Sequence, residues 1–345
     1  MAEHGKKKKR LGVALFVTLN VIVIGVTAYS DFGAEKSGAA RELLDVNMLY
    51  LLLVALCFTV TLGAETLKYY IMAKHTTGLR LPREAFEVTA LGKYYDYITP
   101  LGAGGQPFQM IYLSNQGIDT GPATAMPIVG FISLQAAFIL IGIVVLSTGA
   151  VVQSAALIVP AIIGICFYAA VPLLTVMFAF KPDMTKRFID WCIRALAKLK
   201  LVRKPEEAVA AFERNLASAI SSLRSICNGK GIWWKMLGLS LVFQIALCSM
   251  PFFVLRAFGN TLPFLDVFRS CVYIYLCITF VPTPGNSGAA EGSFYMLFSV
   301  LDQGRLFWAM LVWRMFCYYS YIITGLAVTW LRARRKKAAG SRETL

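Results

Sequence analysis

Hydrophobic residues in this chain fall into long runs that short charged segments separate. Six runs are continuous and long enough to cross a hydrocarbon core of about 30 Å, which takes a helix of about 20 residues. They cover residues 11–29, 47–73, 123–147, 151–180, 232–255 and 306–331. Two more runs, 84–118 and 264–303, are apolar but interrupted by proline and glycine. The pattern predicts an all-α polytopic membrane protein with six full transmembrane helices.

Composition and charge agree with this class. The chain is 57% hydrophobic, and 34 Lys and Arg against 19 Asp and Glu give a net charge of +15. Because the basic residues cluster between apolar runs, we interpret them as determinants of topology and expect no nucleic-acid partner. The eight cysteines and two histidines form no metal-ligand spacing. We therefore expect neither a metal nor a cofactor.

The basic residues also predict the orientation. Of the 34, 27 lie in four segments, 6–10, 68–83, 181–235 and 332–345. Positive segments stay in the cytoplasm, so both termini and the loop 181–231 are expected there, in a multi-pass protein of the cell membrane. Each interrupted run must then return to the side it came from. Since the first arm of 84–118 is only about 22 Å long as a helix, we interpret both runs as re-entrant hairpins rather than pairs of short crossings.

The two interrupted runs have similar sequences. Each opens with Leu-Pro, breaks at Thr-Pro before glycines and ends at Gln-Gly. Residues 1–147 and residues 148–331 contain the same order of predicted elements, namely two spans, one hairpin and a third span. A basic tail, 332–345, follows the second unit. Because three crossings per unit is an odd number, the second unit is expected to be inverted relative to the first. Inverted repeats with broken helices near the midplane are a transporter architecture.

The glycine-rich breaks are candidates for headgroup binding. They contain Gly102, Gly104 and Gly105 in the first hairpin, and Pro284, Gly285, Asn286 and Gly288 in the second. Each is expected to begin a half-helix whose free N–H groups and dipole favour an anion such as a phosphate. Gln106 and Gln109 follow the first break, where they could hydrogen-bond a headgroup or join two helices.

Several ionisable residues fall inside apolar regions, where a charge is costly and commonly functional, and four of them are candidate site residues. Glu291 is a candidate proton site or contact to a lipid amine, and Arg314 a candidate phosphate contact. The alternative is that these two pair with each other. Glu65 and Asp96 each have a lysine within helical reach, so a structural pair is the alternative there as well.

The two breaks also resemble the signature motifs of a known family. "ITPLGAGGQPFQMIYL" (98–113) and "PTPGNSGAAEGSF" (282–294) are similar to those of the lysylphosphatidylglycerol synthase transmembrane region. That region is the flippase domain of MprF-type proteins, which are associated with resistance to cationic peptides. Gly285-Asn286 stands where the family commonly has Gly-Gly, which bears on the headgroup that fits. No loop is long enough for the family's acyltransferase domain, so the resemblance implies transport rather than synthesis.

The resemblance and the pattern together predict a flippase-like transporter for an anionic or aminoacylated phospholipid of the phosphatidylglycerol or lysyl-phosphatidylglycerol type. No G-x-x-x-x-G-K-[ST] motif occurs, so an ion or lipid gradient is the expected drive. One alternative is a membrane component of a lysyltransferase or glycosyltransferase that acts with a separate lipid-modifying enzyme. Another is a non-transporting scaffold for such an enzyme. The loop 181–231 is expected to lie on the anionic inner leaflet or to dock a partner.

Overall fold

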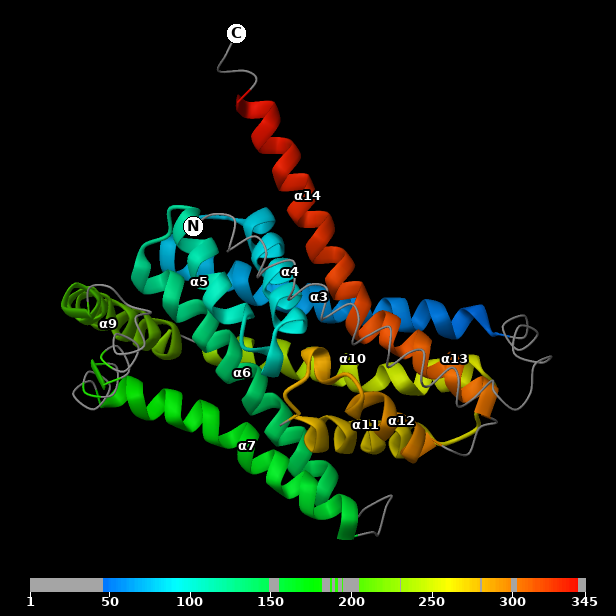
Figure 1. The fold of residues 1–345 in the computed structure, drawn as a ribbon. Helices are drawn as coiled ribbons and strands as arrows, with labels where there is room; N and C mark the ends of the chain where they lie inside the picture. The colour runs from blue at the N-terminus through cyan, green and yellow to red at the C-terminus, as the bar shows by residue number, and fades with distance from the viewer. Residues whose placement is uncertain are drawn as a thin grey trace.

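The structure is a computed structural model, and all its regular elements are helices in the part of the chain that it describes (Figure 1). That part comprises residues 46–148, 155–181, 205–229, 231–279, 281–298 and 303–340, with Arg187, Asp190, Trp191 and Arg194. The predicted span 11–29 lies outside the described residues. So does most of the first half of the loop 181–231.

Four of the predicted spans are long apolar helices. They are α3 (Met48–Thr77), α6 (Thr120–Ser147), α10 (Ile232–Ala257) and the segment Arg305–Arg335, and each has the length and composition to cross a membrane. The last is not one regular helix, because α13 (Gln303–Arg314) continues through a π-helical turn (Met315–Tyr319) into α14 (Ser320–Gly340). In Figure 1 the end of α14 extends well beyond the other helices.

The predicted span 151–180 is described from residue 155 onward, and that part is also helical. It forms α7 (Ala155–Phe180), which contains Pro160 and Pro172. Its apolar part, Val159–Leu174, is shorter than the four long helices. The structure therefore confirms the helices of this all-α architecture, while the full count of crossings stays a prediction.

Both interrupted runs are broken helices, as predicted. The first consists of α4 (Pro82–Ile98), a 3₁₀ turn (Pro100–Gly102) and α5 (Gly105–Asn115). The second consists of α11 (Phe264–Ile278), a 3₁₀ turn (Pro284–Asn286) and α12 (Ala289–Phe298). Proline disfavours the helical conformation in the residue before it, so Thr99 (ψ 146°) and Thr283 (ψ 148°) are extended. Thr99 directly follows α4, whereas α11 has already ended at Ile278, before Pro282.

The two breaks also share a backbone conformation after proline. Two residues with positive φ follow each one, Leu101 (57°) and Gly102 (63°) in the first break, and Gly285 (60°) and Asn286 (54°) in the second. Leucine rarely adopts such a φ, so the surrounding structure must hold Leu101 in place. The sequence similarity of the breaks thus extends to their local geometry.

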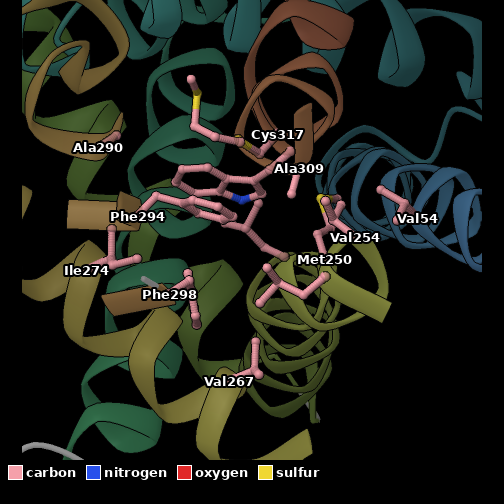
Figure 2. Close-up of a cluster of buried hydrophobic side chains, with 14 of the residues drawn as sticks. Val54, Met250, Val254, Val267, Ile274, Ala290, Phe294, Phe298, Ala309 and Cys317 are labelled. Carbon is pink, nitrogen blue, oxygen red and sulfur yellow. The ribbon is translucent and has the colours of Figure 1, made fainter. Parts of the chain in front are cut away.

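The second hairpin is enclosed by the long helices. Figure 2 shows Phe294 and Phe298 of α12 in a cluster with Val254 and Met250 of α10. The ring of Phe294 stacks on that of Trp313 in α13, with centroids 4.9 Å apart and planes 20° apart. The first hairpin packs in the same way against α3, α6 and α14. Irregular backbone at membrane depth requires such protein neighbours, because lipid cannot satisfy its polar groups.

The second half of the loop 181–231 forms a helix, α9 (Pro205–Asn228), which packs against α6. Close contact is possible because Gly121 of α6 faces Ser218, and any side chain at Gly121 would collide with it. The expected position of this loop on the inner leaflet stays a prediction.

Candidate functional site

The two breaks, which are far apart in the sequence, contact each other through the 3₁₀ turns. An aromatic junction joins them. The ring of Tyr97, just before the first break, meets those of Tyr318 and Tyr321, each with a centroid distance of 5.3 Å. Gly285 of the second break lies against the ring of Tyr318, where an added Cβ would overlap that ring. Both this contact and the positive φ of Gly285 require glycine.

A polar cavity lies beside the first break, between α3, α4, α5 and α6. Its volume is about 40 Å³, which is enough for water molecules but not for a phospholipid headgroup. Four predicted site residues line it together, Glu65, Asp96, Gln106 and Gln109. The hairpin residues that line this cavity come from the first hairpin alone. Its other lining residues are Tyr69, Thr89, Lys93, Pro127, Gly130, Phe131 and Leu134.

Two lysines share the Glu65 carboxylate. Lys68 is fully buried, and its Nζ lies 2.9 Å from Oε2 of Glu65. The same ammonium donates to the Gly130 carbonyl oxygen (3.2 Å) and to the Ser240 hydroxyl (3.0 Å), so Lys68 is anchored inside the protein rather than extended to the surface. Lys93 is held more loosely, with its Nζ 3.9 Å from Oε1 of Glu65.

Asp96 has a different partner from the neighbouring lysine that the sequence offered. Its Oδ1 accepts a hydrogen bond from the Gly105 N–H at 2.9 Å, and the Thr99 hydroxyl accepts one from the Gly104 N–H at 2.9 Å. A side chain at Gly105 would collide with the Asp96 carboxylate. Two of the N–H groups at the start of α5, those of Gly104 and Gly105, therefore already have acceptors, and one of these acceptors is a carboxylate of the chain itself.

The second break carries a buried ion pair. Nε of Arg314 lies 2.6 Å from Oε1 of Glu291, and the two side chains are 6% and 5% exposed. The Nε contact has ion-pair distance without hydrogen-bond geometry, while the terminal nitrogens donate to the Gly285 carbonyl oxygen and the Ser287 hydroxyl. Oε2 of Glu291 accepts from the Gly288 N–H at 2.6 Å. As at the first break, a carboxylate caps the half-helix.

The structure also places functional candidates that sequence reasoning missed. The π-helical turn begins directly after Arg314 and carries Tyr318, and such turns are frequent at functional sites. Thr89 lines the cavity with a buried hydroxyl that has no hydrogen-bond partner in the described structure. The π turn has no recognisable signal in the sequence. Thr89, four residues before Lys93, also has no distinguishing pattern in the sequence, because α3 and α6 complete the cavity around it.

Buried ionic centres at two helix breaks, within a body of long apolar helices, define a polytopic α-helical membrane protein. The family described as the lysylphosphatidylglycerol synthase TM region matches residues 11–325, so the chain belongs to that family and the resemblance is confirmed. No protein among the curated sequences matches it.

Proposed function

We propose that this protein moves an anionic or aminoacylated phospholipid, of the phosphatidylglycerol or lysyl-phosphatidylglycerol type, between the leaflets of a membrane. The observation that carries the proposal is the meeting of two helix breaks, each with a carboxylate at the start of a half-helix and a cation nearby. A charged headgroup must cross about 30 Å of hydrocarbon, and fixed charges and N–H groups at mid-depth lower that cost. Membership in a lipid-related membrane family agrees with this function.

The capping carboxylates suggest how a headgroup would be accommodated. Asp96 and Glu291 accept hydrogen bonds from the N–H groups of Gly105 and Gly288. A lipid phosphate carries the same sign of charge and accepts the same hydrogen bonds, so it can replace either carboxylate at its half-helix. The exchange keeps Arg314 paired with an anion throughout, which avoids leaving a buried charge without a partner.

Movement of the hairpins would open the path. The cavity of about 40 Å³ is too small for a headgroup, so a bound lipid requires the two breaks to separate at the aromatic junction. In a protein with six crossings, two opposed re-entrant hairpins and cytoplasmic termini, rocking of one repeat against the other would expose the breaks to each leaflet in turn. The clustering of the basic residues in four segments and the matching backbone geometry of the two breaks support this arrangement.

Lipid movement can be measured with the purified full chain in phosphatidylcholine vesicles that contain fluorescent phosphatidylglycerol. Dithionite destroys only the outer-leaflet label, so the protected fraction falls if the protein moves lipid. We expect a fall with the native protein and none with Arg314→Gln. Arg334→Gln, which removes an exposed charge outside the site, is the matched control and should behave as the native protein.

The same vesicles separate the other candidate functions. Label that stays protected in all samples, with correctly folded protein, would exclude transport and leave the scaffold. Formation of aminoacyl or glycosyl lipid only after a separate catalytic protein is added, without label movement, would support the enzyme component instead.

A further inference from the structure

Three arginines surround one carboxylate at the start of α4. Glu87 accepts from Nε of Arg83 at 2.9 Å and from Nη1 of Arg335 at 3.1 Å, and Nε of Arg332 lies 3.2 Å away. The Tyr112 hydroxyl donates to the second oxygen of Glu87 at 2.9 Å. Glu84 adds a second carboxylate beside Arg83. Two carboxylates cannot neutralise three guanidinium groups, so this arginine cluster keeps a positive excess.

The three guanidinium groups of the cluster have more N–H donors than Glu87 can accept. Each guanidinium carries five N–H groups, and Glu87 takes only part of them. The side chains of Arg83 and Arg335 are 56% and 51% exposed, and that of Arg332 is 26% exposed. Arg332 also lies over the ring of Tyr112, 4.5 Å from its centroid, which fixes its plane. Oriented guanidinium groups of this kind favour a phosphate over a simple point charge.

An apolar groove of about 540 Å³ begins next to the cluster. It follows α3 from Thr59 to Tyr70, a length of roughly 16 Å at 1.5 Å per residue. Pro82 and Phe86 of α4 form its other side. Pro82 and Phe86 directly precede Arg83 and Glu87 in the sequence, and residues four apart share one face of a helix. The groove and the arginine cluster therefore use adjacent faces of the same part of α4. The other lining residues are Leu62, Gly63, Thr66 and Leu67.

We propose that the arginine cluster and this groove together bind one anionic phospholipid of the cytoplasmic leaflet. Its phosphate contacts Arg83, Arg332 and Arg335, and an acyl chain lies along α3 in the groove. The positive excess selects a lipid with net negative charge over a zwitterionic one, whose own cation would be repelled. Because the chain must fill a groove of this length, a free phosphate meets only half of the site.

This lipid site is separate from the polar cavity at the breaks. On α3 the groove uses Thr66 and Tyr70, whereas the cavity uses Glu65 and Tyr69 on the neighbouring face. Arg332 and Arg335 belong to α14, so a bound lipid would connect the last helix to the first hairpin. The inference therefore holds whether or not the protein moves lipid between leaflets.

Native mass spectrometry of the purified full chain can test the site with dioleoyl-phosphatidylglycerol and dioleoyl-phosphatidylcholine as probes. We expect phosphatidylglycerol to be retained about tenfold more strongly, and the double variant Arg332→Gln/Arg335→Gln to lose that preference. Arg334→Gln is the matched control, since its guanidinium lies 3.7 Å over the Trp330 ring and not on Glu87. Equal loss in the control, or no preference in the native protein, would overturn the charge argument.

A second variant tests the groove with the arginines intact. A Cβ at Gly63 meets no atom within 4 Å, and Gly63 lines the groove, so Gly63→Leu is expected to place its side chain in the groove. Leucine also has a higher helix propensity than glycine. We expect it to reduce phosphatidylglycerol retention, with an unfolding temperature no lower than that of the native chain. Full retention in Gly63→Leu, or equally strong competition by inorganic phosphate, would refute a lipid site. Because Gly63→Leu is expected to fold, the test remains decisive even if the arginine variant does not.

Discussion

The buried pair of Glu291 and Arg314 can be perturbed from either side or from both. Glu291→Gln keeps the shape and still offers an oxygen to the Gly288 N–H, but it leaves the Arg314 guanidinium without a counter-charge. Arg314→Gln removes the cation together with its contacts to Gly285 and Ser287. The double variant removes both charges and leaves two neutral groups that can hydrogen-bond.

The expected stability changes follow from the exposures of the two side chains, 6% and 5%. Breaking a buried pair costs about 3–5 kcal/mol, because the remaining charge stays in a medium of low polarity. We expect each single variant to lose about that much in the free energy of unfolding. The double variant should lose clearly less than the sum of the two, since neither charge is then left alone.

Transport separates a structural pair from a functional one. If Arg314 contacts the lipid phosphate, the double variant regains abundance in the membrane but not lipid movement. The measurement is the rate of label loss in vesicles, normalised to the amount of folded protein that thermal unfolding in detergent reports. A double variant that moves lipid at the native rate would refute the transport role and leave an ordinary salt bridge.

Three further changes test single contacts, each by thermal unfolding of the purified chain. Gly285→Ala should lower the unfolding temperature, because Gly285 has a positive φ and an added Cβ would overlap the Tyr318 ring. Adding Tyr318→Leu, which removes the ring, should restore part of the lost stability. If it restores none, the backbone conformation alone causes the loss. Lys68→Met should cost about 3–5 kcal/mol because it leaves Glu65 to the loose Lys93 contact, whereas the exposed Lys74→Met should change little. Asp96→Ala should cost about 1 kcal/mol more than Asp96→Asn, which can still cap α5, and equal costs would contradict the capping role.

The positions of the helix breaks could be predicted because their cause is local. Proline restricts the residue before it, so α4 ends just before Thr99-Pro100, and Pro282 and Pro284 keep the chain from continuing as a helix after α11. The glycines that follow permit positive φ, so the sequence window alone places both breaks. The long apolar helices were predictable for a similar reason, since hydropathy over about 20 residues decides membrane partitioning. The pairing of Glu291 with Arg314 was one of the two hypotheses drawn from the sequence, because both charges lie in neighbouring apolar segments.

The partners of the other charges could not be predicted, because they come from helices distant in sequence. Lys68 is satisfied by α6 and α10 through Gly130 and Ser240, which no local pattern connects. Glu87 pairs with Arg83, four residues before it on the same helix, and also with Arg332 and Arg335 of α14, which are about 250 residues away in the sequence. Such contacts depend on how helices pack, and a hydropathy pattern with a period of 3.6 residues does not specify that.

The capping carboxylates change how the half-helices should be understood. Free N–H groups at a helix start would attract any anion, including chloride or free phosphate from either side of the membrane. Asp96 and Glu291 remove that attraction while keeping the same geometry ready, so only an anion that also satisfies the neighbouring cation and the exposed backbone can displace them. A phospholipid phosphate arrives with its chains in the bilayer and is thus presented at high local concentration, unlike a soluble ion. Under the proposed function, the self-capped breaks would therefore favour a lipid headgroup over the anions dissolved in water.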